Sequence, residues 1–348
     1  MAGILLVDDS PFVLDELCRI IRDDGGFAVA GRAGNGIAAL ELAERTRPEV
    51  VCLDVDMPVL NGLATLKHLM TRRPVPTVML SALTGAASPV SFECLRLGAV
   101  DVLEKPGGRA GRNLALQKSE ILRELRRAAA VDPSSTRLGR MKRPPAKRPA
   151  GTAERPGRLV LVSAGRAAFG SLLSILNSFP LGRGAALVAK IDVQASVLRA
   201  YAAYAEPFSA LRLEASPIRR ELTADAAYLV SAEEAGLVVA EGRGALRLAP
   251  CAPGGDKALD VESLFESVSE ELGAAAMAVV LAGAPRGTVE GLRHVAFRGG
   301  RSAGVRPESV ADAGVLRRAI DAGILRPARD VETLSRAVAA HVLAEEAA

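Results

Sequence analysis

Three aspartates stand directly after short apolar runs in the first part of the chain. Asp8 and Asp9 follow Ile4–Val7, and Asp54 follows Val50–Leu53. If these runs are strands of one parallel sheet, the three carboxylates meet at the same edge of that sheet. Crowded carboxylates repel one another unless a cation lies among them, and hard oxygen ligands suit Mg²⁺. The pattern therefore predicts a magnesium site at which Asp54 can act as a nucleophile toward phosphorus.

A hydroxyl and an ammonium group follow two further apolar runs and fit the same chemistry. Ser81 ends one run and Lys105 ends another. The ammonium group can pair with the oxygens of a phosphoryl group carried by Asp54, and the hydroxyl can donate a hydrogen bond to the same oxygens. An acidic pair such as Asp8 and Asp9 can also do no more than cap the helix that follows it. Residues suited to phosphoryl chemistry recur at the ends of several apolar runs, which favours the phosphoryl site over a simple helix cap.

The elements that must position these side chains alternate along the first 106 residues. Strands are expected at Ile4–Val7, Phe27–Ala30, Val50–Leu53, Thr77–Leu80 and Asp101–Leu103. Amphipathic, helix-like segments separate them. Five strands that alternate with helices predict a parallel sheet covered on both faces, with its functional crevice at the carboxyl ends of the strands.

The chain is long enough for a second domain of the same class. It has 348 residues, and a domain takes about 150. Residues 126–157 are rich in Pro, Arg and Lys and cannot bury a core, so we interpret them as a basic linker. The linker separates a domain at 1–125 from one at 158–348, where the α/β pattern resumes. We therefore predict an α/β protein with two doubly wound parallel-sheet domains.

The first domain resembles the receiver domains of response regulators, which have a flavodoxin-like fold. The similarity rests on VDDS at 7–10, LDVDMP at 53–58, the hydroxyl of Ser81 and EKP at 104–106. It implies that Asp54 is phosphorylated by a histidine kinase, and that Asp9, Asp54 and the Asp56 carbonyl hold Mg²⁺. One position departs from the family, because Val102 stands where an aromatic residue is usual.

The second half resembles the hydrolase domain of the chemotaxis protein-glutamate methylesterases (CheB type). LVLVSAGRAAFGSLLSILNSFP (159–180), DVESLFESVSEELG (260–273) and VVLAGAPRGTVEGL (279–292) carry the similarity. The family uses a Ser-His-Asp triad to remove methyl esters from chemoreceptor glutamates, and often deamidates receptor glutamines. Laid on this chain, the three triad positions are Gly165, Asp192 and Gly287. Glycine cannot be acylated and no base is available, so the resemblance implies a domain that has lost its triad.

Several interpretations of the second domain remain open. A hydrolase with a rearranged site would need Ser163 as nucleophile and His294 as base, because His68 and His341 are expected on other helices. A binding module would recognise a chemoreceptor, a kinase or another signalling partner without cleaving it. Arg166 and Arg286, at the emptied rim, are able to bind an anion.

Composition excludes several classes of function. Trp is absent and aromatics make up 3% of the residues, which disfavours base stacking, and no recognition helix follows the basic linker, so nucleic acid is not an expected partner. The four cysteines show no paired spacing and are expected to be small buried hydrophobes. No apolar run reaches the length of a membrane span, and no signal peptide is recognisable, so we expect a cytoplasmic protein without membrane insertion.

Overall fold

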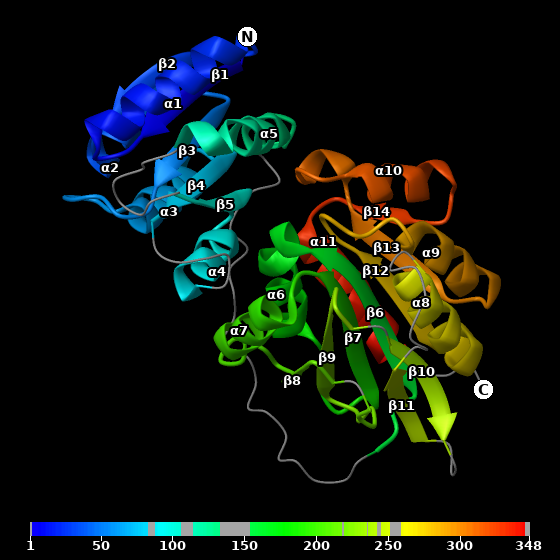
Figure 1. The fold of residues 1–348 in the computed structure, drawn as a ribbon. Coiled ribbons are helices and arrows are strands. Elements are labelled where there is room, and N and C mark those ends of the chain that lie inside the picture. Colours follow the sequence, from blue (N-terminus) through cyan, green and yellow to red (C-terminus); the bar gives the residue numbers. More distant parts are fainter. Residues whose placement is uncertain are drawn as a thin grey trace. The chain divides into compact units, whose positions relative to one another are not determined.

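The computed structural model describes residues 2–82, 88–105, 114–132, 154–217, 219–234, 236–241, 245–250 and 259–344. The chain forms two compact units (Figure 1). Each is built on a parallel sheet with helices on both faces, which confirms the predicted fold class.

The first unit contains a five-stranded sheet in the order β2-β1-β3-β4-β5, with every neighbouring pair parallel. Its strands are β1 (Ala2–Val7), β2 (Phe27–Ala33), β3 (Val50–Asp54), β4 (Thr77–Ser81) and β5 (Asp101–Glu104). Its helices are α1 (Pro11–Asp24), α2 (Gly36–Thr46), α3 (Gly62–Arg72), α4 (Pro89–Arg96), the 3₁₀ turn η2 (Leu114–Gln117) and α5 (Lys118–Ala129). The order of the strands reverses between β1 and β3, so the loops after these two strands border the crevice at the carboxyl edge.

Polar caps fix where the helices of this edge begin. The Ser10 side chain accepts a hydrogen bond from the Val13 N–H and starts α1, with Pro11 in the first turn. Asn35 and Asn61 cap α2 and α3 in the same way. Each cap satisfies one amide that the helix cannot pair internally, so each loop enters its helix at a defined residue.

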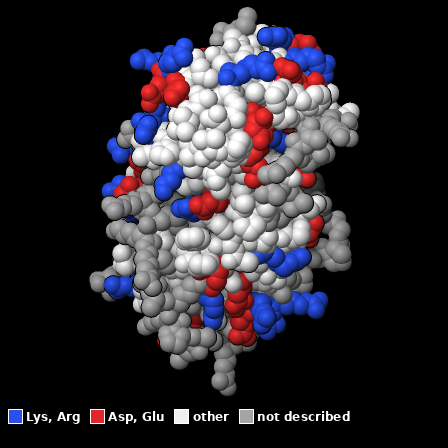
Figure 2. All heavy atoms as spheres, turned by 90° about the vertical axis from the view of Figure 1, so that its left-hand side faces the viewer, with Lys and Arg blue, Asp and Glu red and all other residues white. Residues whose placement is uncertain are grey.

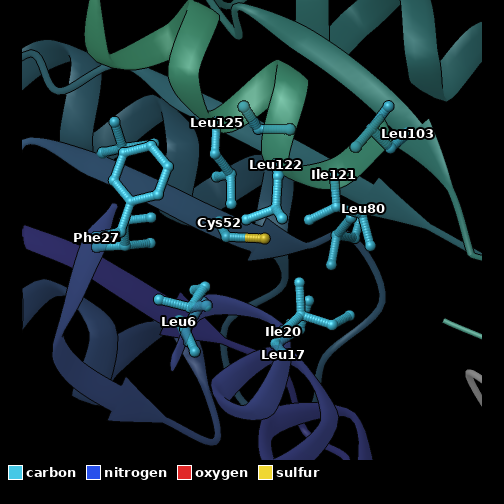
Figure 3. Packing of buried hydrophobic residues seen from close by; sticks show 14 of the residues in the cluster. Leu6, Leu17, Ile20, Phe27, Cys52, Leu80, Leu103, Ile121, Leu122 and Leu125 are labelled. Atoms are coloured by element: carbon cyan, nitrogen blue, oxygen red, sulfur yellow. The ribbon is translucent and has the colours of Figure 1, made fainter. Parts of the chain in front are cut away.

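One large aliphatic core lies between the sheet, α1 and α5. Figure 3 shows its centre, where side chains from β1, β3, β4, α1 and α5 meet around Cys52. Ala128 and Val131 also belong to this core. The first domain was predicted to end at residue 125, but α5 continues to Ala129 because its apolar face packs on the sheet.

The second unit contains a seven-stranded sheet in the order β14-β13-β12-β6-β7-β9-β8, again parallel throughout. Its strands are β6 (Arg158–Gly165), β7 (Ala185–Asp192), β8 (Arg212–Ala215), β9 (Ala226–Ser231), β12 (Ala276–Val280), β13 (Arg301–Val305) and β14 (Arg326–Ala328). A separate antiparallel hairpin joins β10 (Gly236–Glu241) to β11 (Ala245–Pro250).

Helices flank this sheet on both sides. They are α6 (Phe169–Ser178), α7 (Ala195–Ala205), α8 (Leu259–Leu272), α9 (Thr288–Phe297), α10 (Gly314–Asp321) and α11 (Val331–Leu343). Helix α6 packs with α11, and α8 packs with α9 (Figure 1). The chain runs outward from β6 in one direction and later returns to β12 on its other side, so the crevice of this sheet lies between the loops after β6 and β12.

The described surface carries charges of both signs, and the described cysteines are buried, as composition predicts. Acidic and basic side chains are interspersed among the described residues of the face in Figure 2. Cys18, Cys52 and Cys94 are free and buried, and Cys251 lies outside the described residues. Burial raises the pKa of the Cys52 and Cys94 thiols to about 12, which makes them poor nucleophiles. None of the described helices is long and apolar enough to cross a membrane.

Candidate functional site

Three carboxylates converge at the carboxyl edge of the first sheet, as predicted. Asp8 and Asp9 follow β1, and Asp54 is the last residue of β3. One carboxylate oxygen from each lies within 4.8 Å of the others. Asp8 and Asp54 are almost fully buried, at 0% and 2% exposure, whereas Asp9 is exposed. The cluster therefore has a desolvated floor and one open side.

Lys105 supplies the cationic group of this site. Its Nζ lies 2.6 Å from Asp8 Oδ2 and 2.8 Å from Asp54 Oδ1, and the side chain is buried. Burial raises the pKa of the Asp54 carboxyl to about 6, although the lysine opposes the shift. Burial likewise raises the pKa of Asp8. For Lys105 burial acts in the opposite sense, but the two carboxylates outweigh it and the pKa of the ammonium group is raised. The lysine therefore stays charged and holds both carboxylates.

Ser81 and Asp56 complete the predicted set. Ser81 ends β4 and is buried, and its carbonyl accepts a hydrogen bond from the Lys105 N–H at 2.8 Å. The backbone N–H of Asp56 donates a hydrogen bond to the Asp54 carboxylate, so the two residues are adjacent at the edge. The alternative role of the acidic pair as a helix cap does not hold, because Ser10 caps α1.

Two glycines hold the loops of this edge tightly together. A Cβ on Gly62 would lie 2.0 Å from the Asp54 carbonyl oxygen, and one on Gly36 would lie 2.6 Å from the Leu60 carbonyl oxygen. In the loop that joins Asp54 to Gly62, Val59 has a φ of +70° and is 79% exposed. A β-branched residue rarely adopts this conformation, so the loop after Asp54 stores backbone strain.

The residues at this edge fit a hard divalent cation. The Asp8 Oδ2 and Asp54 Oδ1 atoms are buried, and the Lys105 ammonium group lies within hydrogen-bond distance of each. Three carboxylates face a single ammonium group, so negative charge remains at this edge, and carboxylate oxygens are the ligands that Mg²⁺ prefers. Asp9 offers its oxygen from the open side.

The three positions assigned to a triad lie along one edge of the second sheet. Gly165 and Asp192 are register partners at the ends of β6 and β7. Gly287 precedes α9, at the end of the loop after β12, the other neighbour of β6. The Gly165 N–H donates a hydrogen bond to the Ala282 carbonyl at 2.8 Å, so the loops after β6 and β12 are in direct contact.

Gly165 has no room for a side chain. A Cβ built there would lie 2.6 Å from the carbonyl oxygen of Gly283 and 3.0 Å from its Cα. The φ of Gly165 is −113°, which any residue adopts, so the obstacle is space and not backbone conformation. Gly283 has a φ of +69°. The crevice between these loops is therefore closed at its base by backbone.

The structure does not bring Ser163 and His294 together. The Ser163 hydroxyl is fully buried and lies 2.6 Å from the Thr288 Oγ1, and the two hydroxyls share a hydrogen bond. The His294 ring lies between two carboxylates of α8, with Nε2 3.6 Å from Glu262 and Nδ1 3.6 Å from Glu266. A serine that is buried and a histidine engaged elsewhere do not form a nucleophile–base pair.

Comparison with known proteins gives a family for each half of the chain. Residues 4–113 match the response regulator receiver domain, and residues 160–338 match the CheB methylesterase family. A protein-glutamate methylesterase/protein-glutamine glutaminase of Symbiobacterium thermophilum is 30% identical over 85% of this chain and 85% of its own length. The chain belongs to the CheB methylesterase family.

One further relative matches most of the chain, and one solved structure matches the receiver half. A protein-glutamate methylesterase/protein-glutamine glutaminase of Agrobacterium fabrum is 28% identical over 92% of this chain and 91% of its own length. The crystal structure of the response regulator domain of Thermotoga maritima CheB is 37% identical, covers 38% of this chain and 99% of that chain, and has a TM-score of 0.37. The two family matches and the relative of Symbiobacterium thermophilum show that this chain is a CheB-type response regulator with a receiver domain and a methylesterase domain.

Sequence reasoning missed a buried lysine in the second domain, close to the strand edge that holds the three triad positions. Lys190, on β7, is 4% exposed, and its Nζ donates hydrogen bonds to the carbonyls of Ser231, at 2.7 Å, and Glu234. The Glu234 carboxylate in turn accepts from the N–H and hydroxyl of Ser231, both at 3.0 Å. A lysine inside the apolar run AALVAKID is the one signal that would have marked it.

Proposed function

We propose that this chain is a chemosensory response regulator that takes a phosphoryl group on Asp54 from a histidine kinase, and whose second domain binds a partner without hydrolysing it. The observation that carries the proposal is the contrast between the two sheet edges. The edge at Asp54 keeps its carboxylates and Lys105, whereas Gly165, Asp192 and Gly287 supply neither the serine nor the histidine of the family's triad. Chemoreceptors are the partner class that the family relationship suggests.

The residues of the first edge account for phosphoryl acceptance. The Asp54 carboxylate is the nucleophile, and with a pKa of about 6 it is mostly ionised at neutral pH. The Lys105 ammonium group lies 2.8 Å from the same carboxylate and can pair with the phosphoryl oxygens after transfer. The Ser81 hydroxyl can donate a hydrogen bond to the same oxygens. Mg²⁺, held by Asp8, Asp9, Asp54 and the Asp56 carbonyl, would screen the negative charge of the incoming group.

Labelling with acetyl phosphate and Mg²⁺ tests this half of the proposal. The wild-type chain should acquire an acid-stable, base-labile phosphoryl group, and Asp54→Asn should acquire none. Asp15→Asn is the matched control, since Asp15 is an exposed carboxylate on α1 paired with Arg32, and it should label like the wild type. Equal labelling of Asp54→Asn and the wild type would remove Asp54 as the acceptor.

The absence of hydrolysis rests on the chemistry of acyl transfer. A serine needs a base to take its proton and an acid to orient that base, and loss of a triad member costs several orders of magnitude in rate. Ser163 is hydrogen-bonded to Thr288 beneath the edge, and His294 faces α8. Methanol release from membranes with methylated receptors is the direct assay, and we expect none above background.

A surviving methylesterase or glutaminase is the alternative, favoured by the names of the relatives. It predicts methanol release that is lost in Ser163→Ala. That result would overturn the binding-module proposal while leaving phosphorylation of Asp54 intact.

A further inference from the structure

Two arginines border the closed crevice of the second domain. Arg166 directly follows Gly165, and Arg286 lies three residues beyond Gly283 on the loop that touches Gly165. The two arginines therefore lie on the two loops that meet at the contact between Gly165 and Gly283. Arg286 is exposed, and its guanidinium makes no hydrogen bond or ion pair with the described residues, whereas Arg166 is half-buried and has a partner within the fold.

We infer that this rim is a recognition site for a carboxylate, with Arg286 as its main cationic group and Arg166 beside it, and that its ligand is an acidic peptide segment with unmodified glutamate. The inference rests on the proposed function, because it names what the non-hydrolytic domain binds. A guanidinium presents a planar fork of N–H donors that matches a carboxylate in two parallel hydrogen bonds.

The chemistry separates glutamate from its modified forms. A glutamate side chain offers two charged oxygens to the arginine fork. Its methyl ester and glutamine are neutral, so neither forms a bidentate ion pair with the guanidinium. Hydrogen bonds to charged groups are the stronger class, and their loss corresponds to about a tenfold or larger drop in affinity. An enzyme that hydrolyses the ester must accept the neutral form, so arginines at this rim suit a domain that recognises the acid.

Two acidic residues at the same rim set a limit on binding. Asp192, the register partner of Gly165, is exposed at the end of β7, and the carbonyl of Asp312 accepts a hydrogen bond from the Gly283 N–H. An exposed carboxylate on the same strand edge repels an incoming one. Removal of the Asp192 charge should therefore strengthen binding of the glutamate peptide, whereas removal of the Arg286 charge should weaken it.

Fluorescence anisotropy with three labelled peptides of one acidic sequence tests the inference on the full chain. The peptides carry glutamate, γ-methyl glutamate or glutamine at the same positions, and each is measured with and without acetyl phosphate and Mg²⁺. The glutamate peptide should bind at least about tenfold more tightly than the other two. Arg286→Gln should abolish most of this preference, Arg166→Gln should reduce it, and Asp192→Asn should increase it.

Arg336→Gln is the matched control, because Arg336 is an exposed arginine on α11, a helix that begins after β14. It should leave the preference unchanged. Equal binding of all three peptides, no binding in either condition, or an equal loss in Arg336→Gln would each overturn this inference. Methanol release from the ester peptide would instead overturn the proposed loss of hydrolysis, so the two failures are distinguishable.

Discussion

Replacing Gly165 with alanine adds one methyl group at the point where the loops after β6 and β12 touch. That carbon would lie 2.6 Å from the Gly283 carbonyl oxygen and 3.0 Å from the Gly283 carbonyl carbon. Carbon atoms pack best at about 3.5–4.0 Å from their neighbours, so the loop would have to move by several tenths of an ångström or more. The obstructing atoms are backbone, and the same loop is fixed by the hydrogen bond from the Gly165 N–H to Ala282.

Overpacking of this kind costs about 1–3 kcal/mol of unfolding free energy. In a domain of this size each kcal/mol lowers the unfolding temperature by about 2–4 °C, so Gly165→Ala should lower it by about 2–12 °C. Gly165→Ser carries the same Cβ and should cost at least as much. The measurement is thermal unfolding of the full chain, with the transition of the second domain assigned by limited proteolysis.

Gly314→Ala provides the matched control. Gly314 is the first residue of α10, and a Cβ there would meet its nearest neighbours at 4.0 Å. Alanine is preferred over glycine in helices by up to about 1 kcal/mol, so this variant should be as stable as the wild type or more stable. If Gly165→Ala unfolds at the same temperature as Gly314→Ala, the crevice is not closed by backbone and our reasoning is wrong.

Three further predictions concern strain, protonation and the cation. Val59→Gly should stabilise the receiver by about 1 kcal/mol in denaturant unfolding, because glycine adopts a positive φ without the cost that valine bears. Burial lowers the pKa of His341, so stability from its neutral ring should be present above about pH 6.5 and decline as the pH falls below it; His341→Gln should flatten this decline between pH 7 and 5. Mg²⁺ should raise the unfolding temperature of the receiver, and Asp9→Asn should diminish that rise.

Each of these has a result that would contradict it. An equal gain in Val59→Ala would show that loss of the exposed side chain, and not relief of the backbone, is responsible. The Nε2–H of His341 donates to the Ala275 carbonyl at 3.1 Å, and the ring faces the charges of Arg158 and Arg301. An unchanged pH profile in His341→Gln would assign the decline to other groups. A Mg²⁺ response that survives in Asp9→Asn would place the cation elsewhere.

The receiver edge was predictable because each part of it carries a local signal. A short run of Val, Ile or Leu marks each strand, and the polar residue that ends the run marks the edge. The topology then brings Asp8, Asp54 and Lys105 together without any further information. Local patterns did not reveal the burial of Lys105, because it depends on packing against residues that are distant in the sequence, Asp8 and Asp54 among them.

The second domain was less predictable because its contacts are distant in sequence. Ser163 and Thr288 are 125 residues apart, and no local pattern reveals that their hydroxyls meet. Strand β8 has no apolar run, since RLEA forms a strand only by pairing with β9. The segment before β9 is ordered by the Tyr228 hydroxyl, which accepts a hydrogen bond from the Thr223 N–H at 2.8 Å. Tertiary contacts of this kind override weak local preferences.

The ion pairs of Lys105 also determine the formal charge of the receiver site. Asp8, Asp9 and Asp54 contribute three negative charges, and the buried ammonium group cancels one of them. The two that remain equal the charge of a single divalent ion, so a bound Mg²⁺ would balance the formal charge of these four side chains, whereas a monovalent ion would leave them negative. Selectivity for divalent over monovalent cations would thus come from charge balance as well as from ligand type, and Lys105 sets that balance.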